Sequence, residues 1–270
     1  MLTKRLIACF DIISGKVTKA VRFQDNIDIA PAEQLAETVY AAGIDELIFY
    51  DVMASAEKRG IDIQMVKKVA RRVFIPFTVG GGIKSLDDMY ETLKAGAEKI
   101  SVDSMAVRNP VIISEGAKAF GSQCIVLSTQ VKRTGKMPSG YEVYIDGARL
   151  ATGMDAIEWI KCGQELGAGE ICLNSIDNDG TLSGYDLPLM KLAEAAVSVP
   201  LIASGGAGSP EHLKTLFSDT EAQAAIISSM LYSTRMEKNY TVSELKEYLM
   251  INSIDVRPPR MNKEYGETTV

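Results

Sequence analysis

The sequence repeats itself at a fixed offset, and this repeat strongly limits how the chain can fold. Ile75–Ser85 reads IPFTVGGGIKS, and Val199–Ser209 reads VPLIASGGAGS, 124 positions later. Ala42–Phe49 (AGIDELIF) and Leu166–Leu173 (LGAGEICL) are related by the same offset. Internal repeats of this kind indicate a fold built from duplicated units. The sequence therefore predicts two related halves, each about half of the chain.

Each copy of the first pair predicts a buried strand, a tight glycine turn and the start of a helix. Glycine allows positive φ and lets backbone N–H groups approach a ligand closely. Converging N–H groups favour an anion, usually phosphate. Glycine at one such junction is a weak signal, but two equivalent turns suggest a ligand with two phosphates, one held by each half. The alternative is a duplicated fold with one working site.

Eight short apolar runs alternate with eight segments of helical periodicity. The expected strands are Leu6–Phe10, Glu46–Tyr50, Pro76–Val79, Lys99–Val102, Cys124–Thr129, Glu170–Asn174, Leu201–Ala203 and Ala224–Ile227. This alternation predicts a single (β/α)₈ TIM barrel of the α/β class. A doubly wound open sheet is the alternative, but it explains the half-and-half repeat less naturally.

The connections predict one barrel domain and a tail. The domain is expected over residues 1–256, with half-barrels of about 1–121 and 122–256, and residues 257–270 are expected to form a mobile tail. Ile12–Ala30 is interpreted as a long loop with charged and turn residues. Lys132–Ala151 is polar, with a small hairpin expected around Gly140–Gly147.

Composition excludes several classes of function. The chain has 270 residues and a net charge of −6, which argues against a broad nucleic-acid or membrane surface. No apolar run approaches membrane-spanning length, and no signal peptide is evident, so a cytoplasmic protein is expected. The four cysteines lie in apolar runs without metal-like spacing and are expected to be reduced. His212 is the single histidine, which argues against a His-based metal site.

The carboxyl ends of the expected strands carry acids, hydroxyls and glycines. These ends are Asp11, Asp51, Gly80–Gly82, Asp103–Ser104, Gln130, Asp177–Gly180, Gly205–Gly206 and Ser228–Ser229. In a barrel of this type the chemistry takes place at the carboxyl ends of the strands. The pattern predicts a mouth with acids in the middle and glycine turns on opposite sides.

Several motifs resemble those of a known family. IACFD, DELIFYDV, FTVGGGIKS, KISVDS, GAGEICLNSIDNDGTLSGYD and IASGGAGS are similar to the cyclase subunits of imidazole glycerol phosphate synthase, over roughly Met1–Arg257. The resemblance implies a subunit that adds ammonia from a partner glutaminase to a bis-phosphorylated ribulosyl imidazole carboxamide and closes the imidazole ring. It implies no metal and no cofactor.

The resemblance assigns site residues one by one. Asp11 matches the family's first catalytic aspartate, although a loop-capping role would also suit it. Lys19 matches a lysine of a mobile loop over the substrate. Without the resemblance, Lys19 is interpreted as a solvated surface lysine. The expected phosphate-binding residues, which otherwise read as turn formers and caps, are Gly82, Asp103 and Ser104 in one half and Asp179, Gly180, Gly205, Gly206, Ser228 and Ser229 in the other.

Two positions depart from the family pattern. Gln130 stands where the family has its second catalytic aspartate, and a glutamine cannot exchange a proton near neutral pH. Asp103 stands where the family has an asparagine beside a phosphate, and a carboxylate there repels phosphate unless it is neutralised. Both changes affect the expected ring-closing site.

The opposite mouth of the barrel keeps a set of charged residues that match the family. Arg5, Glu46, Lys99 and Glu170 begin four of the expected strands. The resemblance implies that these residues form a gate through which ammonia enters from the glutaminase. The alternative is a set of salt bridges that only stabilises the rim. Glu98 is expected to pair with a lysine of the partner.

Three functions remain open at this point. The first is the cyclase of histidine biosynthesis. The second is a non-cyclising ammonia-channel subunit that serves a sugar amidotransferase, because the segments KAVRF and NSIDNDG resemble paralogues from surface-polysaccharide clusters. The third is a sugar-phosphate isomerase of related fold, which the absence of an acid at Gln130 disfavours.

Overall fold

The computed structural model describes residues 3–259 apart from 22–23, 53, 55–59 and 233–235. Eight parallel strands close into a ring. They are β1 (Arg5–Ile13), β4 (Glu46–Asp51), β5 (Phe77–Gly80), β6 (Lys99–Val102), β7 (Ile125–Arg133), β10 (Glu170–Ser175), β11 (Leu201–Ser204) and β12 (Ala224–Ile226). The pairing of β12 with β1 completes the ring, so the predicted (β/α)₈ barrel is confirmed and the open-sheet alternative is wrong.

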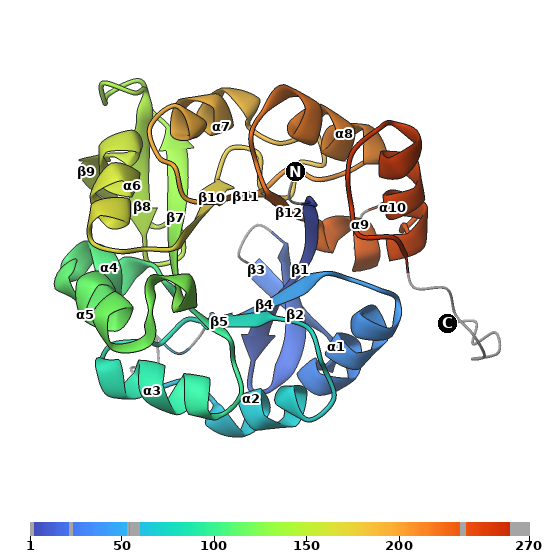
Figure 1. Ribbon diagram of the computed structural model, residues 1–270, viewed down its shortest axis with the longest axis horizontal. Coiled ribbons are helices and arrows are strands. Elements are labelled where there is room, and N and C mark those ends of the chain that lie inside the picture. The colour runs from blue at the N-terminus through green and yellow to red at the C-terminus, as the bar shows by residue number, and fades with distance from the viewer. Residues whose placement is uncertain (1–2, 22–23, 53, 55–59, 233–235, 260–270) are drawn as a thin grey trace.

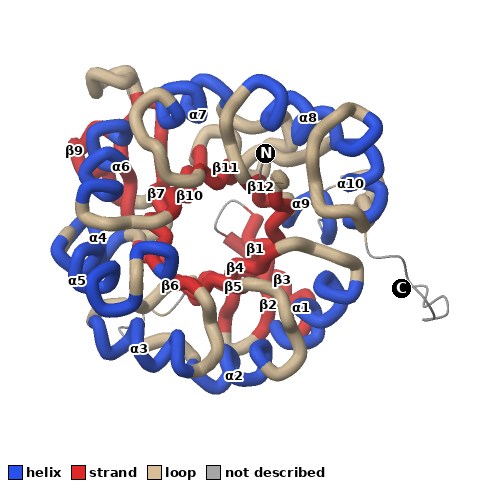
Figure 2. The backbone as a smooth tube through the Cα atoms, in the orientation of Figure 1, coloured by secondary structure: helices blue, strands red, loops and turns tan. Residues whose placement is uncertain are grey.

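Helices surround this ring of strands on the outside (Figure 1; Figure 2). They are α1 (Ala32–Ala41), α2 (Ile63–Ala70), α3 (Leu86–Lys94), α4 (Ser104–Arg108), α5 (Val111–Phe120), α6 (Ala156–Glu165), α7 (Leu187–Glu194), α8 (Pro210–Asp219), α9 (Ser228–Tyr232) and α10 (Val242–Ile251), with a 3₁₀ turn at Ser122–Cys124. The main apolar core lies between the strands and these helices. No helix among the described residues is both long and apolar enough to cross a membrane.

Two antiparallel additions extend the barrel strands. β2 (Lys16–Val21) and β3 (Gln24–Pro31) form a hairpin on the end of β1, so the expectation of a long loop over Ile12–Ala30 is wrong. Val17 and Thr18 of β2 are buried, and they hold this otherwise polar hairpin against the barrel. β8 (Tyr141–Ile145) and β9 (Leu150–Asp155) pair in the same way on the end of β7. The predicted second hairpin is therefore present, but it reaches beyond Gly140–Gly147.

The positions related by the repeat share local geometry. Asp62 caps α2 by accepting hydrogen bonds from backbone N–H groups, and Asp186, 124 positions later, caps α7 in the same manner. Gly82 has φ 78° and Gly206, 124 positions later, has φ 99°. A Cβ atom on Gly206 would lie 1.9 Å from the carbonyl oxygen of Gly184, so a side chain does not fit there. The division into half-barrels stays a prediction.

The last helix is tied to the barrel by a buried ion pair. The Lys246 side chain is fully buried, and its Nζ donates to Asp45 Oδ1 over 2.6 Å and to the Gly43 carbonyl over 2.8 Å. Asp45 also accepts a hydrogen bond from the backbone N–H of Leu6. A buried ion is tolerated only when its partners are in place, so this contact fixes α10 to the start of β1 and β4. The tail was predicted over residues 257–270. The structure describes 257–259 of it, and 260–270 lie outside the described residues.

Candidate active site

A cavity of about 920 Å³ lies at the carboxyl ends of the barrel strands. It is lined by ten of the site residues expected from the sequence: Asp11, Gly82, Asp103, Ser104, Gln130, Asp179, Gly205, Gly206, Ser228 and Ser229. Gly180 lies in the same β10–α7 loop as Asp179 but does not line the cavity. The Lys19 backbone lies on β2, and its side chain is outside the described part of the structure.

Asp11 and Asp103 bring two carboxyl groups to this cavity. Asp11 lies near the end of β1 and is exposed to the cavity. Asp103 directly follows β6 and precedes α4. Within the described residues, no group of three or more His, Cys, Asp or Glu side chains is arranged to hold a metal ion.

Gln130 and Asp103 are in direct contact. Gln130 Nε2 on β7 donates a hydrogen bond to Asp103 Oδ2 over 3.1 Å. The pKa of the Asp103 carboxyl is raised to about 7, chiefly by burial and also by the nearby Asp146 carboxylate. The hydrogen bond from Gln130 and the charge of Arg108 act in the opposite direction. Asp103 is therefore about half protonated at neutral pH, which reduces the repulsion of phosphate that the sequence predicts.

The hydroxyls at the strand ends have different partners. Ser104 Oγ accepts a hydrogen bond from the Asp146 backbone N–H over 3.0 Å, which connects α4 to the β8–β9 turn. Ser228 Oγ accepts from Cys9 N and donates to Cys9 O, both over 2.8 Å. Ser228 thus fixes the start of α9 against β1 while it lines the cavity.

The glycine turn of the second half forms one wall of the cavity. The N–H of Gly184 donates to the Gly206 carbonyl over 2.8 Å, and Asn178 Nδ2 donates to the Gly184 carbonyl over 2.8 Å. A Cβ atom on Gly205 would lie 2.7 Å from the carbonyl oxygen of Ser175. The loop after β10 therefore packs directly on the turn after β11 and fixes its shape.

Sequence reasoning missed a polar group in the barrel interior that also lines the cavity. The Tyr50 hydroxyl is within hydrogen-bonding distance of Ser101 Oγ and Ser128 Oγ, at 3.2 Å each. The Tyr50 ring lies against Gly80, where a Cβ atom would be 2.8 Å from it. Burial raises the pKa of the Tyr50 hydroxyl well above its ordinary value. Tyr50 directly precedes the predicted strand-end acid Asp51, which was the available signal.

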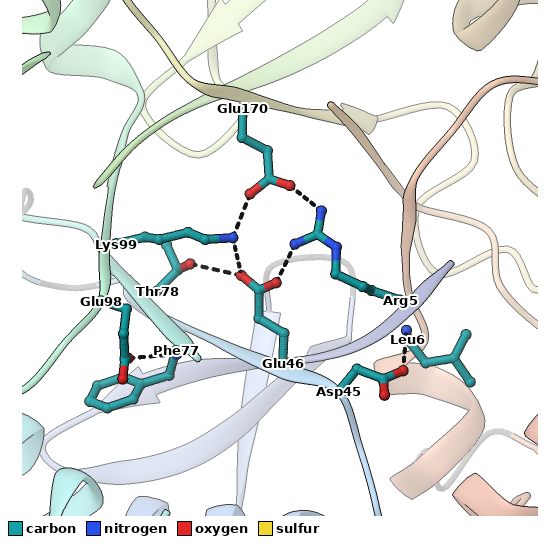
Figure 3. A network of polar contacts seen from close by, with 9 residues as sticks. All are labelled: Arg5, Leu6, Asp45, Glu46, Phe77, Thr78, Glu98, Lys99 and Glu170. Atoms are coloured by element: carbon teal, nitrogen blue, oxygen red, sulfur yellow. Dashed lines mark hydrogen bonds and ion pairs between the residues drawn. The ribbon is translucent and has the colours of Figure 1, made fainter. Parts of the chain in front are cut away.

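The charged residues at the other end of the barrel form a closed ring (Figure 3). We call Arg5, Glu46, Lys99 and Glu170 the charge ring; each is the first residue of its strand. Arg5 forms ion pairs with both glutamates, through Nη1 to Glu46 and Nη2 to Glu170. Lys99 Nζ does the same, at 2.8 Å from Glu46 Oε1 and 2.7 Å from Glu170 Oε2.

Burial differs between the two signs of charge in this ring. The Glu46 and Glu170 side chains are 2% and 7% exposed, whereas Arg5 and Lys99 are 26% and 17% exposed. Burial alone lowers the pKa of Arg5, but the two carboxylates outweigh it and the pKa is raised. Glu98 lies beside the ring and accepts a hydrogen bond from the Phe77 backbone N–H over 2.9 Å (Figure 3).

The chain is similar to known proteins over nearly its whole length. A family profile described as histidine biosynthesis protein matches residues 5–237. A protein of Desulforapulum autotrophicum named imidazole glycerol phosphate synthase subunit HisF is 52% identical over 260 residues, which cover 95% of this chain and 99% of that protein. Proteins of the same name from Syntrophobacter fumaroxidans (50% identity; 95% and 99% coverage) and Nitratidesulfovibrio vulgaris (52%; 91% and 95%) are also similar. The chain belongs to the histidine biosynthesis protein family, in its HisF branch.

Proposed function

We propose that this chain is the cyclase subunit of an imidazole glycerol phosphate synthase in histidine biosynthesis. It takes ammonia from a glutaminase subunit and closes the imidazole ring of a bis-phosphorylated substrate. The observation that carries this proposal is the placement of the two polar sites on one barrel. The charge ring lies where the strands begin, and the acid-lined cavity lies where they end.

The cavity residues take the following roles in the proposed reaction. Asp11 exchanges protons with the reacting atoms, because an exposed carboxylate at a strand end is within reach of a bound substrate. The turns at Gly82 and at Gly205–Gly206 present backbone N–H groups to the two phosphates. Ser104 and Ser229 add hydroxyls at the same two places.

We place the glutaminase on the end of the barrel that carries the charge ring. Two of the most exposed large apolar side chains lie on that end. Phe74, in the loop before β5, is 76% exposed, and Ile251, at the end of α10, is 82% exposed. Exposed apolar side chains around a polar centre are typical of a protein interface. The four cysteines are free, which suits the cytoplasmic location that we propose for the complex.

Co-elution with the cognate glutaminase subunit tests the interface. At micromolar concentrations we expect one gel-filtration peak for the wild type, and two peaks for Phe74→Glu. Val111→Glu, at a 53% exposed position at the start of α5 on the other side of the barrel, is the matched control and should keep one peak. Separate peaks for the wild-type proteins would contradict the partner assignment.

A second candidate function is favoured by Gln130, which cannot exchange a proton. In this alternative the chain conducts ammonia to a separate sugar amidotransferase and does not close a ring. Turnover of the bis-phosphorylated substrate with saturating ammonium separates the two functions. We expect imidazole glycerol phosphate as product, whereas an intact glutaminase complex without ring closure would support the conduit.

A further inference from the structure

The cavity contains a carboxyl group and an amide side by side at the ends of two neighbouring strands. Ile100, Ser101 and Val102 of β6 pair in register with β7, and this pairing brings the residue after β6 next to Gln130. Gln130 Nε2 lies 3.1 Å from Asp103 Oδ2, and both side chains line the cavity. The Gln130 amide cannot exchange a proton near neutral pH, but the Asp103 carboxyl, its hydrogen-bonding partner, can.

The surroundings of Asp103 keep its carboxyl group able to both give and take a proton near neutrality. Asp146 and Arg108 face it, and these two form an ion pair of 2.5 Å with each other, so neither charge acts alone on Asp103. Cys172 on β10, whose own pKa burial raises to about 12, is a neutral neighbour. The pKa of Asp103 of about 7 lies where general acid–base catalysis is most effective.

We propose that Asp103 is the second acid–base residue of this cavity, opposite Asp11, and that Gln130 is its positioning residue. This inference rests on the proposed function. As the nitrogen of ammonia forms a bond to the ketose carbonyl carbon, the carbonyl π pair moves to oxygen, which takes the proton of the Asp103 carboxyl. The resulting carboxylate then accepts one proton from the new ammonium nitrogen. The step yields a hydroxyl and an amine on one carbon and returns Asp103 to its starting form.

The fixed donor on Gln130 explains why an amide suits position 130. Its Nε2 holds one carboxyl oxygen of Asp103 and leaves the other oxygen for the substrate. A second carboxylate at that distance would share a proton with Asp103, because two like charges in contact cannot both ionise. The pair therefore contains one carboxyl group, at position 103 after β6, and one amide, at position 130 on β7.

Steady-state kinetics of four proteins test this assignment: wild type, Asp103→Asn, Gln130→Asp and the double variant, each with saturating ammonium. We expect Asp103→Asn to lower kcat by about 10²-fold or more with a nearly constant KM. The pH–rate profile of Asp103→Asn should also lack the limb that the wild type shows near pH 7. The double variant should recover at least tenfold over Asp103→Asn, because it restores one carboxyl group to the pair. Gln130→Asp alone should move the pH optimum upward.

Each other outcome contradicts the assignment. Turnover of Asp103→Asn within about threefold of wild type, with the same pH profile, would overturn it. If the double variant forms product and the wild type does not, the fold supports ring closure but Asp103 has no acid–base role in the wild type. If neither protein forms product, the proposed cyclase function itself fails, and the inference fails with it. Asp87→Asn, an exposed change in the first turn of α3, is the control for loss of a carboxylate.

Discussion

Glu46 and Glu170 begin strands on opposite sides of the barrel and share the same two cations. They are also the two glutamates related by the 124-residue offset. Each carboxylate accepts from both Arg5 and Lys99, so the four charges cancel within the ring (Figure 3). The ring is therefore closed and has no net charge in the chain alone.

Removal of Lys99 from the charge ring should destabilise the fold. In Lys99→Met the two buried carboxylates keep only Arg5, and an unpaired buried charge costs about 3–5 kcal/mol. Lys161→Met is the matched control, because Lys161 pairs with Glu158 on an exposed helix surface, where an ion pair contributes little to stability. Urea unfolding of both variants measures the difference. Equal midpoints would show that the ring contributes no stability.

Gly206→Ala should damage both the fold and the proposed phosphate site. The new Cβ would lie 1.9 Å from the Gly184 carbonyl oxygen, at a φ of 99° that side chains rarely adopt. Gly153→Ala is the control, because φ is 73° there but no atom lies within 4 Å. We expect Gly206→Ala to lose at least about 2 kcal/mol more free energy of unfolding than Gly153→Ala. Thermal unfolding of both variants measures this difference. Similar losses of unfolding free energy would mean that the loop after β10 moves away from the new Cβ atom.

The stability of the wild type should fall relative to Asp103→Asn as the pH rises. The pKa of Asp103 is about 7 in the folded chain and ~3.9 in an unfolded one. Between these values the folded state binds more protons, so the contribution of this group is present below about pH 4 and is lost as the pH rises through 7. We expect Asp103→Asn to gain about 2–4 kcal/mol on the wild type between pH 4 and pH 8. Urea unfolding of both proteins across that pH range measures this gain. A difference in unfolding free energy that does not change with pH would contradict the raised pKa of Asp103.

Sulfate should bind more readily at the turn of the second half than at Gly82. Asp103, beside Gly82, is partly buried, whereas Asp179, which lines the cavity in the second half, is exposed, so that water and salt screen its charge more strongly. Because sulfate stays divalent, the occupancy beside Gly82 should rise as the pH falls below 7 and Asp103 becomes neutral. Crystals soaked in sulfate at pH 5.5 and pH 8 show this directly. Equal occupancy at both sites and both pH values would mean that Asp103 does not act on this site.

The barrel could be predicted from the sequence because its strands are short apolar runs that alternate with helical segments. Leu6–Phe10 and Leu47–Tyr50 are continuous apolar runs, so their position and type are evident. The hairpin over Lys16–Pro31 was missed because polar and charged residues interrupt the apolar pattern of its strands. The five-residue helices α4 and α9 are too short to show a helical period.

The site could be predicted only where strand ends define it. Parallel strands bring their carboxyl ends together, so Asp11 and Gln130 could be placed in one cavity without coordinates. Tyr50 and Ser128 lie within strands, and their contact across the barrel depends on the stagger between strands that the sequence does not specify. The raised pKa of Asp103 was also inaccessible, because it depends on burial by residues from other elements.

The hydrogen bond between Gln130 and Asp103 also restricts how such a sequence can evolve. Starting from an amide at 103 and an acid at 130, one substitution gives either two acids that compete for a proton or two amides without an acid. Each single substitution therefore changes the number of carboxyl groups in the pair, and only the double exchange keeps that number at one.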